Sequence, residues 1–231
     1  MPADALPVVF IPALLCDEAM YSDVIAGLGS TIEAQVLLSP KPRLEESVAD
    51  ILARAPATFA LVGTSYGSNL ALEIALAAPD RVSMLCLSGC DPSAPKSDGP
   101  DLAGGFEVAP EAVIDMLAGL VVRPEAIDAA VEFKLMAHRI GGAAGAVQAH
   151  ALSARQEAAS RLGTLKMPTL LLWGEDDVLV PAAIGHALAD ALPHAHFHAI
   201  SGSGHLPTLE KPVECTAILS KFFQEEPQHT H

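Results

Sequence analysis

Short apolar runs alternate with longer stretches of mixed polarity along most of this chain. The apolar runs are rich in Val, Ile, Leu and Phe and too short for helices, which is typical of buried strands. We expect strands over 8–11, 34–38, 59–62, 82–88, 170–173 and 196–200, and helices over 18–28, 44–55, 69–78, 181–192 and 212–223. This alternation predicts an α/β fold, with a mostly parallel sheet of about six strands covered by helices on both faces.

One long segment, 91–165, interrupts the alternation because it contains no convincing strand. Its first part, 93–105, is rich in Pro, Gly, Ser and Asp and is therefore predicted to be a loop. Helical patterns follow over 110–120, 124–138 and 143–159. We therefore expect a helical cap, 91–165, inserted into a core made of 1–90 and 166–231. Such a cap covers the carboxyl ends of the strands, where ligands bind in open parallel sheets.

The composition narrows the classes of protein and partner. The 231 residues are 51% hydrophobic and 18% charged, which indicates a globular chain with a sizeable core rather than a disordered one. The formal net charge of −15 disfavours binding to nucleic acid or to an anionic membrane. The partner we expect is therefore a small-molecule substrate, and the pattern does not indicate an oligomeric state.

The cysteines and the N-terminal segment bear on the compartment. Cys16, Cys86, Cys90 and Cys215 show no Cys-x-x-Cys spacing, so we expect buried free thiols in a reducing compartment. The first apolar run is preceded by an aspartate and by no basic residue, unlike the start of a signal peptide. No apolar stretch approaches the roughly 20 residues of a membrane span. These features predict a cytoplasmic protein.

A Gly-x-Ser-x-Gly sequence, Gly63-Thr64-Ser65-Tyr66-Gly67, lies where the third expected strand gives way to a helix. In that context the serine sits on a sharp, strained turn that exposes its hydroxyl as a nucleophile. The glycines are needed because side chains there would collide with the neighbouring strand and helix. The bare pattern also occurs by chance, with an ordinary turn serine as the alternative, so the catalytic partners decide its meaning.

A serine hydroxyl needs a base to take its proton, and the base needs a third group to fix its tautomer. His205 follows the sixth expected strand. Three carboxylates follow the fifth strand: Glu175, Asp176 and Asp177. Asp91, after the fourth strand, is a further candidate acid. Because the carboxyl ends of parallel strands share one edge of the sheet, these side chains are expected to converge on the serine.

These motifs resemble those of the α/β-hydrolase superfamily over nearly the whole chain. The most specific matches are the Gly-x-Ser-x-Gly sequence, the segment 173–181, and the Gly-His and Glu-x-Pro sequences within 204–212. They are similar to small-capped members such as 3-oxoadipate enol-lactonases, methyl ester carboxylesterases and proline iminopeptidases. The resemblance implies the α/β-hydrolase fold, here without an antiparallel hairpin before the first strand. The family pattern Gly-x-x-Asp-x-x-x-Pro places the acid at Asp177, whereas some relatives place it at the position of Asp91.

The intermediate of acyl transfer needs two backbone N–H donors for its oxyanion. Tyr66, the residue after the nucleophile, supplies one of them in this arrangement. The resemblance implies that the other comes from the loop after the first strand, where Leu14 occupies the donor position. Relatives commonly have His-Gly before that donor, and this chain has Pro12-Ala13 instead. A simple strand-exit loop is the alternative for this segment.

Two further groups of residues carry weaker signals. His194, His196 and His198 share one face of the last strand, a spacing that can bind zinc. No nearby Cys or carboxylate completes such a site, so we expect a surface face. The glycine-rich segment 141–145 follows no strand and is not continued by Lys-Ser or Lys-Thr, so it is neither a phosphate loop nor a dinucleotide fingerprint. We expect no cofactor and no metal.

Together these features predict a serine hydrolase that cleaves a small carboxylic ester or lactone through an acyl-enzyme on Ser65. Phe133, Met136 and Leu206 either line the substrate pocket or simply pack in the core. The same triad also supports acyl transfer, perhydrolysis or C–C bond hydrolysis. A ligand-binding receptor that keeps the fold without catalysis is an alternative of another class.

Overall fold

The structure, a computed structural model, describes residues 5–95 and 99–224. Its centre is a six-stranded sheet with the strand order β2-β1-β3-β4-β5-β6, in which every neighbouring pair is parallel. The strands are β1 (Leu6–Ile11), β2 (Ile32–Val36), β3 (Phe59–Thr64), β4 (Val82–Ser88), β5 (Thr169–Gly174) and β6 (Ala195–Ile200). The sheet confirms the predicted α/β class, and no antiparallel hairpin precedes β1 in the described part of the chain.

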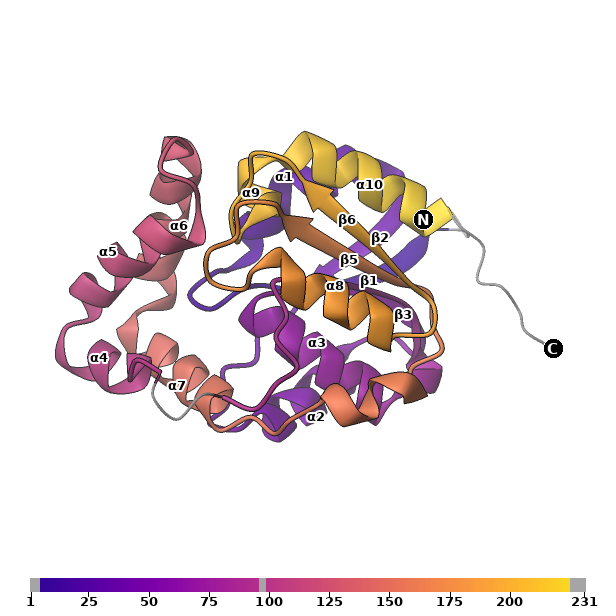
Figure 1. The fold of residues 1–231 in the computed structure, drawn as a ribbon, viewed down its shortest axis with the longest axis horizontal. Coiled ribbons are helices and arrows are strands. Elements are labelled where there is room, and N and C mark those ends of the chain that lie inside the picture. The colour runs from indigo at the N-terminus through magenta and orange to yellow at the C-terminus, as the bar shows by residue number, and fades with distance from the viewer. Residues whose placement is uncertain (1–4, 96–98, 225–231) are drawn as a thin grey trace.

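Helices cover both faces of the sheet (Figure 1). One face carries α1 (Ser22–Leu28) and α10 (Pro212–Gln224). The other face carries α2 (Leu44–Arg54), α3 (Tyr66–Ala77) and α8 (Ala182–Ala191). Short 3-10 helices are η1 (Glu18–Tyr21), which leads into α1, η2 (Gly29–Thr31) and η3 (Pro79–Arg81).

Strand β1 shows why the central strands are apolar at every position. Val8 and Phe10 pack into the layer that contains α1 and α10, whereas Val9 and Ile11 pack into the layer that contains α2, α3 and α8. Successive side chains of a strand point to opposite faces, so a strand covered on both sides has no position left for a polar side chain. All four side chains are almost fully buried.

The segment between β4 and β5 forms α4 (Leu102–Val108), α5 (Pro110–Val121), α6 (Ile127–Ile140), α7 (Gly142–Ser153) and the 3-10 helix η4 (Ala159–Thr164). Helices α4 to α7 lie at the end of the sheet toward which the strands point (Figure 1). The last of these elements, η4, instead contacts α3 and α8 and packs with the core. We call α4–α7, residues 102–153, the cap, and the division of the chain at residues 91 and 165 stays a prediction.

Two helices were not expected from the sequence pattern. Helix α4 lies partly within the segment predicted as a loop, of which residues 96–98 fall outside the described residues. Its first turn is capped by Asp101, whose Oδ1 accepts the N–H of Gly104 at 2.9 Å, and Phe106 is buried against α7. The other is α9 (Pro207–Glu210), a single turn that begins with proline directly after the histidine loop. None of the helices in the described part of the chain has both the length and the hydrophobicity that a membrane crossing requires.

Candidate active site

Ser65 occupies a sharp turn between β3 and α3. Its φ of 56° and ψ of −117° lie outside the regions that residues with a Cβ normally adopt. The turn is fixed on both sides, because the N–H of Ser65 donates to the carbonyl of Ser88 on β4 at 2.7 Å. The carbonyl of Ser65 accepts the N–H of Ser68 at 2.9 Å and both the N–H and the side-chain amide of Asn69. The backbone that carries the hydroxyl is therefore rigid.

Gly67 lets this turn lie directly against the exit of β1. A Cβ at Gly67 would stand 2.1 Å from the carbonyl oxygen of Ile11 and 2.4 Å from that of Pro12. No side chain fits at such distances, which is the physical reason for the second glycine of the Gly-x-Ser-x-Gly sequence. The serine turn and the loop after β1 are thus brought together.

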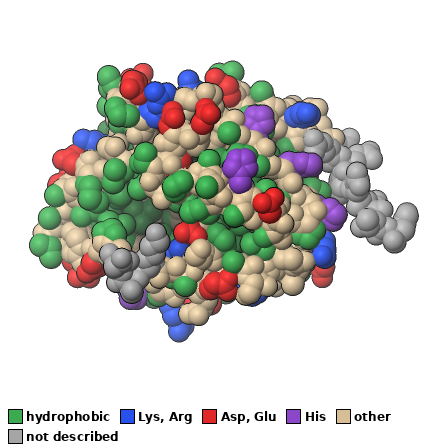
Figure 2. All heavy atoms as spheres, viewed as in Figure 1, with side chains coloured by type: hydrophobic (Ala, Val, Ile, Leu, Met, Phe, Trp, Pro, Cys, Tyr) green, Lys and Arg blue, Asp and Glu red, His purple; other side chains and the backbone are tan. Residues whose placement is uncertain are grey.

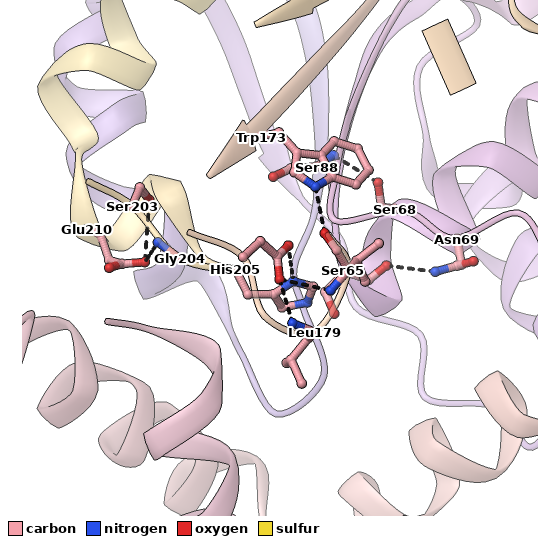
Figure 3. A network of polar contacts seen from close by, with 12 residues as sticks. Ser65, Ser68, Asn69, Ser88, Trp173, Leu179, Ser203, Gly204, His205 and Glu210 are labelled. Carbon is pink, nitrogen blue, oxygen red and sulfur yellow. Dashed lines mark hydrogen bonds and ion pairs between the residues drawn. The ribbon is translucent and has the colours of Figure 1, made fainter. Parts of the chain in front are cut away.

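His205 and Asp177 form a buried pair. Nδ1 of His205 lies 2.7 Å from Oδ2 of Asp177, and the two side chains are only 3% and 1% exposed. The other carboxylate oxygen, Oδ1, accepts the N–H groups of Leu179 and Val180 at 2.9 Å each. Figure 3 shows His205 close to Ser65 in the same network. A carboxylate held on Nδ1 fixes the ring so that Nε2 remains to act as a base.

The other candidate acids lie elsewhere. Glu175 and Asp176 are exposed, and Asp176 forms an ion pair of 3.2 Å with Arg123. The carboxylate of Asp91 accepts the N–H of Ser93 at 3.0 Å in its own loop. The structure therefore brings Asp177 to the histidine, as the family pattern implies, and leaves the others apart from it. The catalytic role of the pair stays a prediction.

Gly89 is a site residue that the sequence analysis missed. It follows Ser88 at the end of β4, has a φ of +61°, and lies against the imidazole of His205. A Cβ at Gly89 would stand 2.6 Å from Cε1 and 2.9 Å from Nδ1 of that ring. Because the carbonyl of Ser88 also holds Ser65, the end of β4 positions both the serine and the histidine. The sequence offered only a Ser-Gly pair after a strand, and such a pair is too common to identify Gly89 as a residue of the site.

No direct hydrogen bond joins the hydroxyl of Ser65 to the His205 ring within the described residues. This is compatible with catalysis, because hydrogen bonds between nucleophile and base are often long before substrate binds. The positions of the two residues follow instead from their shared contacts with the end of β4.

Among residues 13–16 of the loop after β1, one backbone N–H group has no acceptor within the described residues. The N–H of Ala13 donates to Sδ of Met20, and that of Cys16 donates to the carbonyl of Ala13. The N–H of Leu15 donates to Oε1 of Gln148 at 3.0 Å. Between them, the N–H of Leu14 meets no acceptor in the described part of the chain. An unused donor beside the serine turn is what an oxyanion hole requires.

Tyr66 supplies the second unused donor. It is the first residue of α3, so its N–H has no partner within the helix. Its side chain is 2% exposed and packs into the core layer of α2 and α3, which leaves only its backbone for the site. Leu14 and Tyr66 thus present the two N–H groups that the sequence analysis named, and their role in catalysis stays a prediction.

Glu210 joins the histidine loop to the cap, a function that the sequence pattern did not reveal. One carboxylate oxygen accepts the N–H of Gly204 at 2.7 Å, and the other accepts the N–H of Arg123 between α5 and α6 at 3.0 Å. Figure 3 shows Glu210 with Ser203 and Gly204. Burial raises the pKa of Glu210, against the effect of these N–H donors. The carboxylate therefore connects the loop of His205 to the cap.

The remaining candidates are not brought into this network. Phe133, Met136 and Leu206 are at most 1% exposed and pack in the core, so a place in the substrate pocket stays a prediction for them. His196 and His198 lie exposed on the edge strand β6, as expected for a surface face. No group of three His, Cys, Asp or Glu residues among those described is arranged to hold a metal ion.

The four cysteines are buried and free, as predicted. Burial raises the pKa of each thiol, to about 12 for Cys90 and Cys215, so none is a thiolate nucleophile at neutral pH. A cavity of about 660 Å³ lies away from the triad, between α2, α3 and the segment after α7. Leu44, Val48 and Arg155 contribute to its walls, and neither the triad nor the two oxyanion donors do.

Comparison with known proteins places this geometry in a family. The sequence profile of the alpha/beta hydrolase family matches residues 18–218, which is most of the chain. The crystal structure of the enol-lactonase from Burkholderia xenovorans LB400 is similar with a TM-score of 0.88 and 17% sequence identity. The match covers 96% of this chain and 93% of that one. At this identity the likeness shows the fold.

Two curated relatives are similar in sequence. A 2-hydroxy-6-oxononadienedioate/2-hydroxy-6-oxononatrienedioate hydrolase from Cupriavidus pinatubonensis is 30% identical over 158 residues, 63% of this chain and 55% of that protein. A pimeloyl-acyl-carrier-protein methyl ester esterase from Aliivibrio salmonicida is 25% identical over 195 residues, 79% of this chain and 75% of that protein. The chain spans about half the length, or less, of several curated relatives that it matches.

Proposed function

This chain belongs to the alpha/beta hydrolase family, and we propose that it is a serine hydrolase that cleaves a small carboxylic ester or lactone. The observation that carries the proposal is the buried contact of 2.7 Å between Nδ1 of His205 and Oδ2 of Asp177, next to the strained turn at Ser65. A histidine oriented by a carboxylate beside a partly exposed serine on a strained turn is the arrangement that activates a hydroxyl nucleophile.

The reaction runs through an acyl-enzyme. Oγ of Ser65 attacks the carbonyl carbon while Nε2 of His205 takes its proton, and the N–H groups of Leu14 and Tyr66 bind the developing oxyanion. The protonated histidine then gives its proton to the leaving alcohol. A water molecule, deprotonated by the same ring, attacks the acyl group. The bond from the acyl carbon to Oγ then breaks, the ring returns the proton to Ser65, and the acid is released. Asp177 stays ionised throughout and stabilises the imidazolium.

The surface near the site supports an apolar substrate. Figure 2 shows a hollow between the cap and the core whose visible lining is mostly hydrophobic. Val178 and Leu179, directly after Asp177, are 68% and 40% exposed. Exposed apolar side chains beside polar reacting groups are typical of pockets that bind small organic molecules. The names of the relatives, an esterase and an enol-lactonase, agree with the bond type proposed here.

C–C bond hydrolysis is a second candidate, because the Cupriavidus relative at 30% identity is named as a hydrolase of 2-hydroxy-6-oxo dienedioates. Acyl transfer and perhydrolysis use the same triad and differ only in the acceptor of the acyl group. Product analysis separates these reactions. In one set of incubations the substrate is a p-nitrophenyl ester, with or without added alcohol or hydrogen peroxide as acceptor. In another the substrate is a 2-hydroxy-6-oxo dienoate. An ester hydrolase converts the p-nitrophenyl ester to the free acid even when alcohol or hydrogen peroxide is added. It leaves the dienoate intact.

The direct test compares wild type with Ser65→Ala on p-nitrophenyl acetate and butyrate, together with labelling by a fluorophosphonate. We expect Ser65→Ala to lower kcat by at least about 10⁴-fold, because the acyl-enzyme can no longer form. Ser30→Ala, an exposed serine far from the triad in sequence, is the matched control and keeps wild-type turnover. Undiminished turnover in Ser65→Ala would remove this residue from the mechanism. Labelling of wild type at Ser65 without steady-state turnover of any ester would favour a receptor instead.

A further inference from the structure

Leu15, next to the proposed oxyanion donor, has an unusual backbone. Its φ is 63°, and Ser65 is the only other non-glycine residue with a positive φ in the described part of the chain. The side chain of Leu15 is fully buried. The left-handed region is unfavourable for a bulky residue and persists only where the surroundings hold it. The loop after β1 is therefore constrained by something outside itself.

The first constraint acts on the backbone of Leu15. Its N–H donates to Oε1 of Gln148 at 3.0 Å, across 133 positions of sequence. Gln148 lies on the cap helix α7 and is only 4% exposed, which is unusual for a glutamine. A buried amide is retained where its hydrogen bond matters, because an unpaired group there is costly.

The second constraint acts on the side chain of Leu15. Gly145 precedes Gln148 by three positions, so the two share one face of α7. A Cβ at Gly145 would stand 2.7 Å from Cδ2 of Leu15 and 3.4 Å from the ring of Phe106. The glycine thus makes the room into which the leucine packs. One face of α7 holds both the backbone and the side chain of the strained residue.

We propose that Gln148 and Gly145 are positioning residues for the oxyanion hole: from the cap, they hold Leu15 so that the N–H of Leu14 stays free and directed at the reacting carbonyl. This inference rests on the proposed function. It also gives a role to the glycine-rich segment 141–145, which matches no phosphate or dinucleotide loop.

The physical reason lies in which backbone N–H groups of the loop already have an acceptor. Those of Ala13, Leu15 and Cys16 each have an acceptor, and that of Leu14 has none among the residues that the structure describes. Without the oxygen of Gln148, the buried N–H of Leu15 would lose its acceptor. The loop would then rotate its peptide units to recover a hydrogen bond, and the N–H of Leu14 would turn with them. A donor displaced in this way binds the oxyanion of the transition state less strongly, so kcat falls.

The test replaces Gln148 by methionine, which keeps the length of the side chain and removes the strong acceptor. Gln156→Met, at an exposed position after α7, is the matched control. Rates are measured with p-nitrophenyl butyrate and divided by the concentration of sites titrated with a fluorophosphonate. We expect Gln148→Met to lower kcat by about 10- to 100-fold with KM changed by less than about threefold, somewhat less than the loss of a complete donor.

Two further readouts separate positioning from general stability. An alkyl trifluoromethyl ketone forms a tetrahedral adduct with the serine, so its inhibition constant should rise by the same factor by which kcat falls. The pH profile of kcat/KM should keep its acidic limb, because the histidine and its carboxylate are untouched. Gly145→Ala acts on Leu15 through its side chain and should lower kcat in the same way, which keeps the test available if Gln148→Met fails to fold.

Three results would overturn the inference. They are a kcat of Gln148→Met within twofold of wild type, a loss confined to KM, or an unchanged affinity for the trifluoromethyl ketone. The rate of phosphonylation at Ser65 gives a readout that does not depend on turnover. If wild type is labelled and hydrolyses no ester, the proposed function fails while the labelling rates of the variants still test the inference. If wild type is neither labelled nor active, both fail.

Discussion

The turns at Ser65 and Leu15 occupy similar places in the fold, but contacts from different parts of the molecule hold them. Each follows the end of a parallel strand, β3 or β1, and each places a residue with a Cβ at positive φ. Ser65 is held from within the core, by the carbonyl of Ser88 on β4 and by the first turn of α3. Leu15 is held from outside the core, by Gln148 of the cap.

This difference separates two parts of the proposed chemistry. The turn of the proposed nucleophile is held by contacts that the sheet provides, whereas the position of the proposed oxyanion donor follows, in our inference, from an inserted helix. A change in the cap therefore leaves the serine in place and alters how well its transition state is stabilised. Glu210 gives the cap a similar connection to the histidine loop, through the N–H groups of Arg123 and Gly204. We infer that the cap contributes to rate as well as to substrate choice.

The largest effect should come from breaking the turn held by the core. Gly67→Ala places a Cβ 2.1 Å from the carbonyl oxygen of Ile11, and neither backbone segment can move without disturbing the sheet. We expect the free energy of unfolding to fall by about 3 kcal/mol or more, measured by urea denaturation, with activity lost in the same variant.

Gly119→Ala is the control for this substitution. Gly119 lies inside α5 with open space around its Cα, so alanine should stabilise the helix by about 0.5–1 kcal/mol. A Gly67→Ala variant as stable as wild type would show that the close approach of the serine turn to β1 is not a requirement of the fold.

A smaller effect on stability and a large one on activity should follow from Gly89→Ala. The new Cβ would stand 2.6 Å from Cε1 of His205, so the ring must move away from the serine or lose its contact with Asp177. We expect kcat/KM on p-nitrophenyl butyrate to fall by about 100-fold, because a general base that is out of place loses about this much of its effect.

The matched control isolates the contact with the ring from backbone strain. Gly29 has a φ of +60°, nearly that of Gly89, and nothing lies near the position of its Cβ. Gly29→Ala therefore also places a Cβ at positive φ, at a cost of about 1–3 kcal/mol, without touching the site. If both variants lose equal stability and both keep full activity, the histidine is not positioned by the end of β4.

Much of the core could be predicted from the sequence because its signals are local. Buried strands and the helices between them have distinct hydrophobic patterns, and Ser65 and His205 follow strands that end at one edge of the sheet. The order and parallel pairing of the six strands agree with that expectation. Asp177 required the family pattern, since three adjacent carboxylates cannot be distinguished by spacing alone.

What the sequence could not show depends on contacts between distant segments. Gly89 and Gln148 are ordinary in their local sequence, and their roles come from a ring 116 positions later and a loop 133 positions earlier. Helix α4 contains two adjacent glycines, which argue against a helix, and forms because Asp101 caps it and Phe106 is buried. No local pattern records such tertiary contacts.

The smallest effect should come from the second connection between the cap and the loop after β1. Arg139, at the end of α6, donates to both carboxylate oxygens of Asp17 at 2.7 and 3.1 Å. Arg139→Gln removes this pair, which is partly exposed, so we expect kcat to fall by at most about fivefold. Arg43→Gln, which breaks an exposed pair with Glu46, is the control and should leave kcat unchanged.

The pH dependence of stability checks whether the Asp17 pair acts as described. Burial acts to raise the pKa of Asp17, but the hydrogen bonds from Arg139 and from the N–H of Ala19 outweigh it and hold the pKa below 3.8. A carboxylate with a lowered pKa in the folded state contributes stability that is fully present above 3.8 and is lost as the pH falls through the lowered value. The difference in Tm between wild type and Arg139→Gln should therefore be constant from about pH 7 to pH 5 and shrink below about pH 4. A difference that instead grows as the pH falls would mean that another group, and not Asp17, holds this end of the cap.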